Sequence, residues 1–259
     1  MTAVSSHGTG RKTRMPKVKV NDIEMYYEVH GQGEPLLMLH GFTGSSQNWK
    51  PWINNLKQHF QLIIPDLRGH GKTTNPSKKY TAKQSTQDVT ALIEQLNIDR
   101  FHGVGCSSGG DILLHLSTKK PERIHKMVLD GTVHYFSKQL RQGYRDYIPS
   151  REHWDLLRQL HYYGDKQIKL LIKQFQEMEH SYDDVNFTPS DLSRIQAETL
   201  VILGDRDKYI SVDFAVEMYE FIPDSYLWIV PNAGHAVTYT HADMLKKGIL
   251  DFFTGKWET

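Results

Sequence analysis

One six-residue segment constrains the fold of this chain more than any other feature. It is Gly-Cys-Ser-Ser-Gly-Gly at positions 105–110, and it joins two short apolar runs. The pattern G-x-S-x-G between apolar runs predicts a strand, a sharp turn and a helix. Such a turn strains the backbone of its central residue, Ser107, so the residues two before and two after it must be small. Gly105 and Gly109 meet this requirement. We therefore expect the hydroxyl of Ser107 to be exposed above the end of a sheet.

Short apolar runs alternate with helical patterns through most of the chain. The runs that predict strands are 17–20, 23–29, 36–39, 62–64, 101–104, 127–129, 200–203 and 227–230. Apolar residues at helical spacing predict helices over 49–60, 89–96, 215–222 and 244–253. The first two strands, separated by Asn21 and Asp22, are typical of an antiparallel hairpin. Together these elements predict the α/β class, with a mostly parallel central sheet and helices on both faces.

Residues 134–193 interrupt this alternation. They contain no strand-like run but two helical patterns, at 154–160 and 168–178. The segment follows the sixth predicted strand, where an open α/β sheet carries its binding crevice, so we interpret it as a helical lid, or cap. Its many aromatic residues predict a largely apolar, aromatic-lined pocket. The expected organisation is a flexible leader at 1–16, an α/β core at 17–133 and 194–259, and the lid at 134–193.

Composition excludes several classes of protein. The 31 Lys and Arg residues nearly balance the 30 Asp and Glu residues, so no nucleic acid or anionic membrane is indicated as a partner. No apolar stretch approaches the length of a membrane span. The single cysteine, Cys106, excludes an intramolecular disulfide and suits a reducing compartment, so we expect a cytoplasmic protein. The histidines lack the spacing of a helical metal site, and no complete nucleotide-binding motif is present, so we expect neither a metal nor a cofactor.

Two later turns supply the partners that a nucleophilic serine needs. A serine hydroxyl must lose its proton to a base, and the base must be oriented by a carboxylate. The turn Gly204-Asp205-Arg206-Asp207 follows one predicted strand and supplies carboxylates, and His235 follows the last predicted strand. The order serine, acid, histidine, with each residue after its own strand, indicates a catalytic triad.

With these motifs, the chain resembles the α/β-hydrolase fold family over residues 17–253. The segments that carry the resemblance are His40-Gly41-Phe42, Asp66-Leu67-Arg68-Gly69-His70-Gly71, 105–110, 204–207 and Gly234-His235. The resemblance implies that Ser107 is the nucleophile, His235 the general base and then the general acid, and Asp207 the orienting carboxylate. It also implies an oxyanion hole formed by the main-chain N–H groups of Phe42 and Ser108.

Other assignments of the triad remain open at this stage. Ser108 also has small residues on both sides, which would suit a shifted turn. Cys106 could be the nucleophile, although Val104 would then occupy a position that requires glycine. Asp205 or Asp130 could be the acid, because Asp130 ends its own predicted strand and some members of the fold carry the acid there.

The most direct interpretation is a carboxylesterase-like serine hydrolase. It would cleave a small or medium carboxylic ester, thioester or lactone through an acyl-enzyme on Ser107, with this small molecule as its only expected partner. One alternative is a non-ester member of the fold, namely a carbon–carbon bond hydrolase, a perhydrolase or a lyase. A second alternative is a ligand-binding protein that retains the fold. Pocket residues, which the triad does not determine, decide among these possibilities, and the sequence indicates no oligomeric state.

Overall fold

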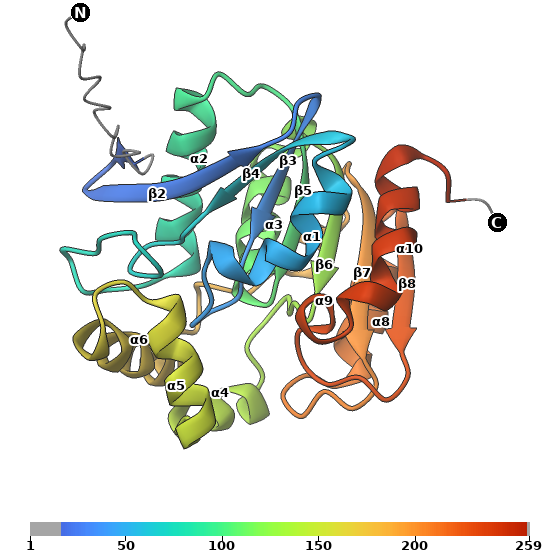
Figure 1. Ribbon diagram of the computed structural model, residues 1–259. Coiled ribbons are helices and arrows are strands. Elements are labelled where there is room, and N and C mark those ends of the chain that lie inside the picture. The colour runs from blue at the N-terminus through green and yellow to red at the C-terminus, as the bar shows by residue number, and fades with distance from the viewer. Residues whose placement is uncertain (1–16, 258–259) are drawn as a thin grey trace, which may run out of the picture.

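The computed structural model of the protein describes residues 17–257, so the expected leader at 1–16 lies outside the described residues. Eight strands form one sheet in the order β1-β2-β4-β3-β5-β6-β7-β8 (Figure 1). Their bounds are β1 Lys17–Val20, β2 Ile23–His30, β3 Glu34–Leu39, β4 Phe60–Pro65, β5 Phe101–Cys106, β6 Ile124–Asp130, β7 Glu198–Gly204 and β8 Ser225–Val230. Strand β2 pairs antiparallel with β1 and with β4, and every other pair is parallel. The mostly parallel sheet that the sequence predicts is confirmed.

Helices cover both faces of the sheet (Figure 1). The core helices are α1 Lys50–Leu56, α2 Ala82–Gln95, α3 Ser108–Lys119, α8 Val212–Phe221, α9 Val237–Thr240 and α10 Ala242–Thr254. Helices α2, α3 and α8 pack in one apolar cluster, and α1 and α10 pack in another. Strand β3 contributes to both clusters in alternation, because Leu37 and Leu39 belong to the first and Leu36 and Met38 to the second. A strand buried on both faces therefore appears in the sequence as a continuous apolar run.

The expected helix over 49–60 is partly wrong. Helix α1 ends at Leu56, and Phe60 is the first residue of β4. The turn between them is closely packed, since a Cβ atom at Gly31 would lie 2.4 Å from the carbonyl oxygen of Lys57. Phe60 packs in the same apolar cluster as Trp52 and Leu56, which explains why its spacing fits the helical pattern although it lies on a strand.

The segment between β6 and β7 is largely helical. Its helices are α4 Lys138–Arg145, α5 Arg151–Leu160, α6 Asp165–Glu177 and α7 Pro189–Leu192, with one short 3-10 helix, Met178–His180, directly after α6. The predicted helical patterns match α5 and α6, whereas α4 and α7 were not expected. Helix α4 is eight residues long and its only large apolar side chains are Leu140 and Tyr144, which are too few to form a recognisable helical pattern. Figure 1 shows α4, α5 and α6 together at the end of the sheet where β5 and β6 point. We call this segment, residues 134–193, the helical insertion.

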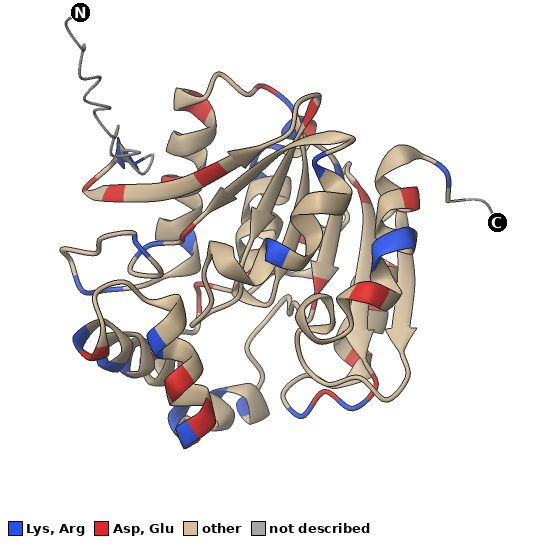
Figure 2. Cartoon of the chain, viewed as in Figure 1, with Lys and Arg blue, Asp and Glu red and all other residues tan. Residues whose placement is uncertain are grey.

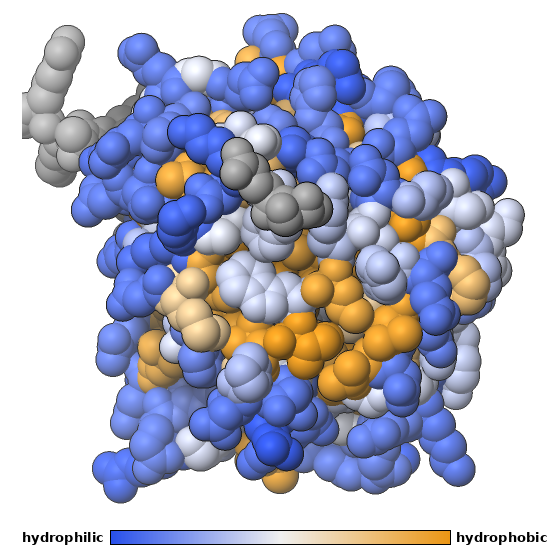
Figure 3. Space-filling model, turned by 90° about the vertical axis from the view of Figure 1, so that its right-hand side faces the viewer, coloured by the Kyte–Doolittle hydropathy of each residue, from blue (hydrophilic) through white to orange (hydrophobic). Residues whose placement is uncertain are grey.

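The surface carries charges of both signs. Figure 2 shows Lys and Arg interspersed with Asp and Glu, including along the helical insertion, in keeping with the balanced composition. Figure 3 shows apolar side chains gathered on the face at the end of the sheet that carries β8. Tyr226, Leu227, Trp228 and Ile229 of this edge strand are each partly exposed. Within residues 17–257, no helix combines the length and the apolar character needed to cross a membrane.

Candidate active site

Ser107 occupies the sharp turn between β5 and α3 that the sequence predicts. Its backbone has φ 51° and ψ −120°, in the left-handed half of conformational space that a serine adopts only under strain. The neighbouring glycines make this turn possible. A Cβ atom at Gly105 would lie 2.5 Å from the main chain of Gly109, and one at Gly109 would lie 2.2 Å from the carbonyl oxygen of Leu39. The main-chain N–H of Ser107 donates to the carbonyl of Asp130 at 2.7 Å, which fixes the turn to the next strand.

The two rival nucleophiles occupy different environments. Cys106 is the last residue of β5 and is fully buried, and burial raises the pKa of its thiol well above the usual value. A protonated thiol is a poor nucleophile. Ser108 is the first residue of α3, and its backbone lacks the positive φ that marks Ser107. The geometry therefore favours Ser107, whose role stays a prediction.

His235 and Asp207 form the acid–base pair of the site. Nδ1 of His235 lies 2.7 Å from Oδ2 of Asp207, whose side chain is completely buried. The second carboxylate oxygen of Asp207 accepts the main-chain N–H groups of Tyr209 at 2.8 Å and Ile210 at 3.1 Å. Burial lowers the pKa of His235, but the hydrogen bond and charge of Asp207, together with the charge of Asp130, outweigh it and raise the pKa above its ordinary value. The imidazole therefore takes up a proton more readily than that of an ordinary histidine.

The two rival acids do not reach Nδ1 of His235. Asp205 accepts the main-chain N–H of Asn232 at 2.6 Å, so it ties its own turn to the loop that carries His235. Asp130 is fully buried and accepts both the main-chain N–H and the hydroxyl of Thr238, at 2.8 and 2.6 Å. It therefore fixes the start of α9, just after His235. Both residues support the imidazole from outside the pair.

The loop after β3 carries the expected oxyanion donor. Gly41 N–H donates to the hydroxyl of Tyr239 at 3.0 Å, and Thr43 N–H donates to Nε2 of His70 at 3.1 Å. Between them, the N–H of Phe42 has no acceptor among the described residues.

The second expected donor, Ser108, begins α3, where main-chain N–H groups are free of helical acceptors and the helix dipole favours an anion. The arrangement suits a developing oxyanion above Ser107.

Three buried histidines accept hydrogen bonds from the loops that follow β3 and β4. His40 accepts the N–H of Leu67 at 3.0 Å, His70 accepts that of Thr43, and His161 accepts that of Gly71 at 3.0 Å. Burial lowers the pKa of His40 to about 3 and that of His161 to about 4, and it lowers the pKa of His70 well below the usual value. All three are therefore neutral acceptors. His161 lies in the helical insertion, and no motif in the sequence indicates its role.

Two cavities meet at Ser107. The first has a volume of about 130 Å³, and we call it the aromatic cavity; the rings that line it belong to Phe42, Tyr144, Tyr147, Phe175 and Tyr209. The second has a volume of about 200 Å³, and we call it the leucine cavity, after Leu156, Leu157 and Leu160 of α5. Ser107 and His235 line both. A substrate bound at Ser107 can thus extend one arm into each cavity.

The aromatic residues of the helical insertion serve different purposes. Tyr144, Tyr147 and Phe175 line the aromatic cavity, in agreement with the expected pocket. Phe136 and Phe187 are buried in the core instead. The exposed rings are those of Tyr135, Tyr162, Tyr163 and Tyr182. The count of aromatic residues in the sequence therefore overstates how many face the site.

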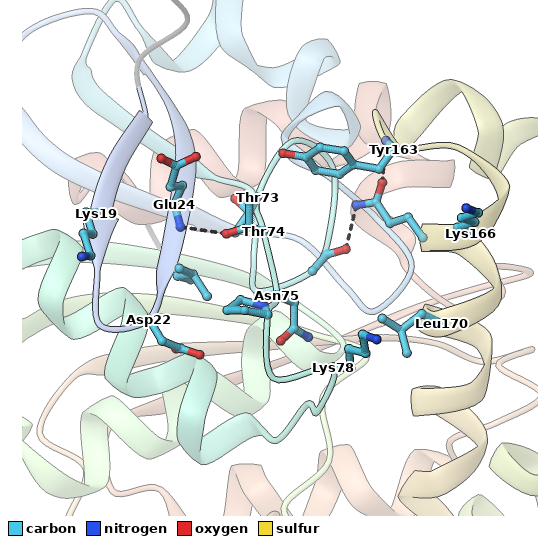
Figure 4. A pocket seen from close by; sticks show the side chains of 14 residues that line it. Lys19, Asp22, Glu24, Thr73, Thr74, Asn75, Lys78, Tyr163, Lys166 and Leu170 are labelled. Carbon is cyan, nitrogen blue, oxygen red and sulfur yellow. Dashed lines mark hydrogen bonds between the residues drawn. The ribbon is translucent and has the colours of Figure 1, made fainter.

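A larger groove, of about 900 Å³, lies apart from the reacting groups (Figure 4). It runs between the β1–β2 hairpin, the loop around Thr74 and helix α6, and none of the triad residues lines it. Lysines and carboxylates both line it, so its charge is mixed. Gln167 of α6 donates to the carbonyls of Gly69 and Gly71, at 2.7 and 3.1 Å, which ties the helical insertion to the core beside this groove.

Known proteins resemble this chain over most of its length. A family model described as alpha/beta hydrolase fold matches residues 34–141. The 2-hydroxy-6-oxononadienedioate/2-hydroxy-6-oxononatrienedioate hydrolase 1 of Pseudomonas putida is 27% identical, over 98% of this chain and 100% of its own. Human serine hydrolase BPHL is 27% identical, over 94% of this chain and 87% of its own. A solved meta-cleavage product hydrolase from Pseudomonas fluorescens has a TM-score of 0.75 at 23% identity, over 90% of this chain and 95% of that chain.

Proposed function

Because this chain is a hydrolase of the α/β-hydrolase fold superfamily, we propose that it is a serine hydrolase whose nucleophile is Ser107. The observation that supports this most is the 2.7 Å contact between His235 and the buried Asp207, beside the strained turn that presents Ser107. His235 takes the proton as Oγ of Ser107 bonds to a carbonyl carbon of the substrate. The N–H groups of Phe42 and Ser108 then stabilise the oxyanion, and such donors are each worth about 10²–10³ in rate.

The tetrahedral intermediate then breaks down to an acyl-enzyme. His235 returns its proton to the leaving group as the bond to the carbonyl carbon breaks, which leaves an acyl group on Ser107. Water, deprotonated by the same imidazole, then attacks the acyl group and releases a carboxylic acid. The net reaction adds the hydroxyl of water to the acyl fragment and its hydrogen to the leaving fragment. No group outside the protein, other than water, is needed for this balance.

We further propose that the bond cleaved is a carbon–carbon bond next to a ketone, rather than the ester bond that the motifs first suggested. The similar proteins from Pseudomonas putida and Pseudomonas fluorescens are carbon–carbon bond hydrolases, which favours this alternative. Two cavities that meet at Ser107 suit a substrate that is cut in its middle. Within the described residues, neither cavity is lined by Lys or Arg. The described lining of the two cavities therefore offers no Lys or Arg to an acidic arm such as that of the dienedioate named for the Pseudomonas putida relative.

We also infer that the helical insertion acts as a lid. Its residues line both cavities: Tyr144 of α4 and Phe175 of α6 face one, and Leu157 of α5 faces the other. A segment that forms one wall of both cavities would expel water from the site when it is closed. For the compartment, the single buried cysteine remains the argument for the cytoplasm.

Two substrates that give the same acyl-enzyme would show whether the protein cleaves an ester bond or a carbon–carbon bond. Phenyl acetate and the uncharged diketone benzoylacetone can both leave an acetyl group on Ser107, with phenol or acetophenone as the leaving fragment. We expect the wild type to release acetophenone and Ser107→Ala to lose at least about a thousandfold in rate. Release of phenol alone would indicate an ester hydrolase. Turnover of neither, together with no labelling of folded protein by a fluorophosphonate, would indicate the ligand-binding alternative.

A further inference from the structure

Asp111 places a carboxyl group at the wall of the aromatic cavity, with one of its two oxygens unpaired. It lies in the first turn of α3, and its main-chain N–H donates to the carbonyl of Ser107 at 3.2 Å, so the two residues are one helical turn apart. The residue is only 5% exposed, and its side chain lines the cavity. Oδ1 is buried and has no hydrogen-bond partner among the described residues. The triad chemistry described above does not use this group.

Nothing in the surroundings of Asp111 explains why a carboxyl group is buried there, and these surroundings disfavour its ionised form. Burial, followed by the nearby charge of Asp184, raises the pKa of Asp111 well above the usual value, and the N–H of Val133 lowers it only in part. A buried polar atom without a partner destabilises the fold. An acid in the first turn of a helix is favourable, but an exposed side chain there gains the same benefit. Oδ1 of Asp111 is therefore left without a partner in the described protein, and a molecule in the cavity would supply one.

The aromatic cavity fits a small cation. Asp111 is the only carboxyl group among its described lining residues, and Lys and Arg are absent from that lining. The ring of Phe175 packs at 4.9 Å from that of Tyr144 and at 4.8 Å from that of Tyr147, so three rings form one wall. Aromatic faces attract an ammonium group, and a desolvated carboxylate attracts it more strongly still. An acidic arm would meet repulsion from an ionised Asp111 and would find no counter-charge.

We propose that the aromatic cavity binds a primary ammonium group on the acyl arm of the substrate, with Asp111 as its counter-ion. The arm is short, because the N–H of Asp111 bonds directly to the carbonyl of Ser107 and the cavity that both residues line holds only about 130 Å³. The substrate class is thus an aminoacyl compound in which two or three carbons separate the amine from the scissile carbonyl. This inference rests on the proposed attack by Ser107, because that attack places the carbonyl at one end of the arm.

Matched phenyl esters would test the selectivity. The esters of β-alanine and butanoic acid differ only in an ammonium group against a methyl group, and the monoester of succinic acid carries a carboxylate instead. We expect the wild type to prefer the β-alanine ester over the butanoate by at least about tenfold in kcat/KM. Asp111→Asn keeps the shape of the side chain and removes its charge, so we expect this preference to fall to about one. Asp184→Asn, which alters a neighbouring carboxylate outside the cavity, should keep the preference within about threefold of wild type.

Two results would overturn the proposal. One is an equal preference for the β-alanine ester in wild type and Asp111→Asn. The other is a wild-type preference for the succinate monoester, because that would mean a protonated Asp111 donating to an anionic arm.

A binding measurement separates this inference from the proposed function. If no ester is turned over, titration calorimetry of β-alaninamide and butanamide against Ser107→Ala still tests the cavity. Binding of β-alaninamide alone, lost when Asp111→Asn is added, would support the cation site although the proposed reaction had failed. Equal binding of the two amides, or binding of neither, would overturn the cation site. Circular dichroism and thermal unfolding of each variant establish that the protein tested is folded.

Discussion

Nε2 of His161 lies 2.9 Å from the carbonyl oxygen of Thr43, so a residue of the helical insertion contacts the loop that carries the expected oxyanion donor. Because the other ring nitrogen accepts the N–H of Gly71, one imidazole joins three segments that are distant in sequence. The position of Phe42 N–H thus depends on whether the helical insertion is in place. If the proposed lid closes over the substrate, the same movement would therefore position the proposed oxyanion donor.

We expect His161→Ala to lower kcat by about tenfold to a hundredfold, because small displacements of catalytic groups have effects of that size. The loss should appear mainly in kcat, since the cavity walls remain. Steady-state kinetics with phenyl acetate would measure it. His180→Ala is the matched control, because His180 lies in the same insertion but is largely exposed and pairs only with its neighbour Glu179. An unchanged kcat for His161→Ala would mean that the insertion does not position the loop.

Stability should fall as the pH is lowered below about 6.5, the ordinary pKa of histidine. The folded-state pKa values of His40 and His161 lie at about 3 and about 4, because burial disfavours the charged ring. The unfolded chain therefore binds protons first, and each group loses its stabilising contribution as the pH falls from about 6.5 toward its folded pKa. Urea unfolding at several values between pH 7 and pH 4.5 would show the decline. His161→Gln should make the decline shallower, and an identical slope would contradict this assignment.

The two acids of the turn after β7 should differ sharply in their effect on turnover. Asp207→Asn removes the carboxylate that orients His235, and we expect kcat to fall by up to about 10⁴ through the wrong imidazole tautomer. Asp205→Asn changes a carboxylate two residues away that binds only main chain and Arg206, so it should keep kcat within about threefold. If Asp205→Asn were the more damaging change, the assignment of the acid would have to be reversed.

Activity should be lost toward acid at a higher pH than an ordinary histidine would give. The pKa of His235 is lowered by burial but raised more by Asp207 and Asp130, so it lies above the usual value. A protonated His235 cannot accept the proton of Ser107, and kcat/KM therefore falls as the pH drops through this pKa. A profile of kcat/KM between pH 5.5 and pH 9 would locate the midpoint. A midpoint well below 6.5 would mean that Asp207 does not act on the free enzyme's imidazole.

The turn at Ser107 could be predicted because every constraint on it is local. Two glycines, two apolar runs and one serine within about a dozen residues define a strand, a turn and a helix. The contact of His235 with the turn at 204–207 could be predicted for a related reason, since each follows its own strand and parallel strands end at one edge. The choice of Asp207 over Asp205 came from the resemblance to the family. The roles of these residues in catalysis stay predictions that the experiments above address.

The features that sequence reasoning missed depend on packing between distant segments. Phe60 fits a helical period because its strand buries it in the same cluster as the helix before it. His161 has no motif, and its partners Thr43 and Gly71 are about a hundred residues away. Asp111 gave a signal that could have been used, since a carboxylate four residues after the nucleophile interrupts an otherwise small and apolar helix face.

The backbone of Ser107 has a positive φ, which glycine adopts at a lower free-energy cost than serine, the residue that the proposed chemistry requires. A population of variants selected only for thermal endurance would therefore drift away from serine at this position. A stability screen would therefore favour glycine over serine at position 107, whereas a turnover screen would favour serine. Any engineering of this scaffold has to score both properties, because the reactive position is also one that the fold tolerates at a thermodynamic disadvantage.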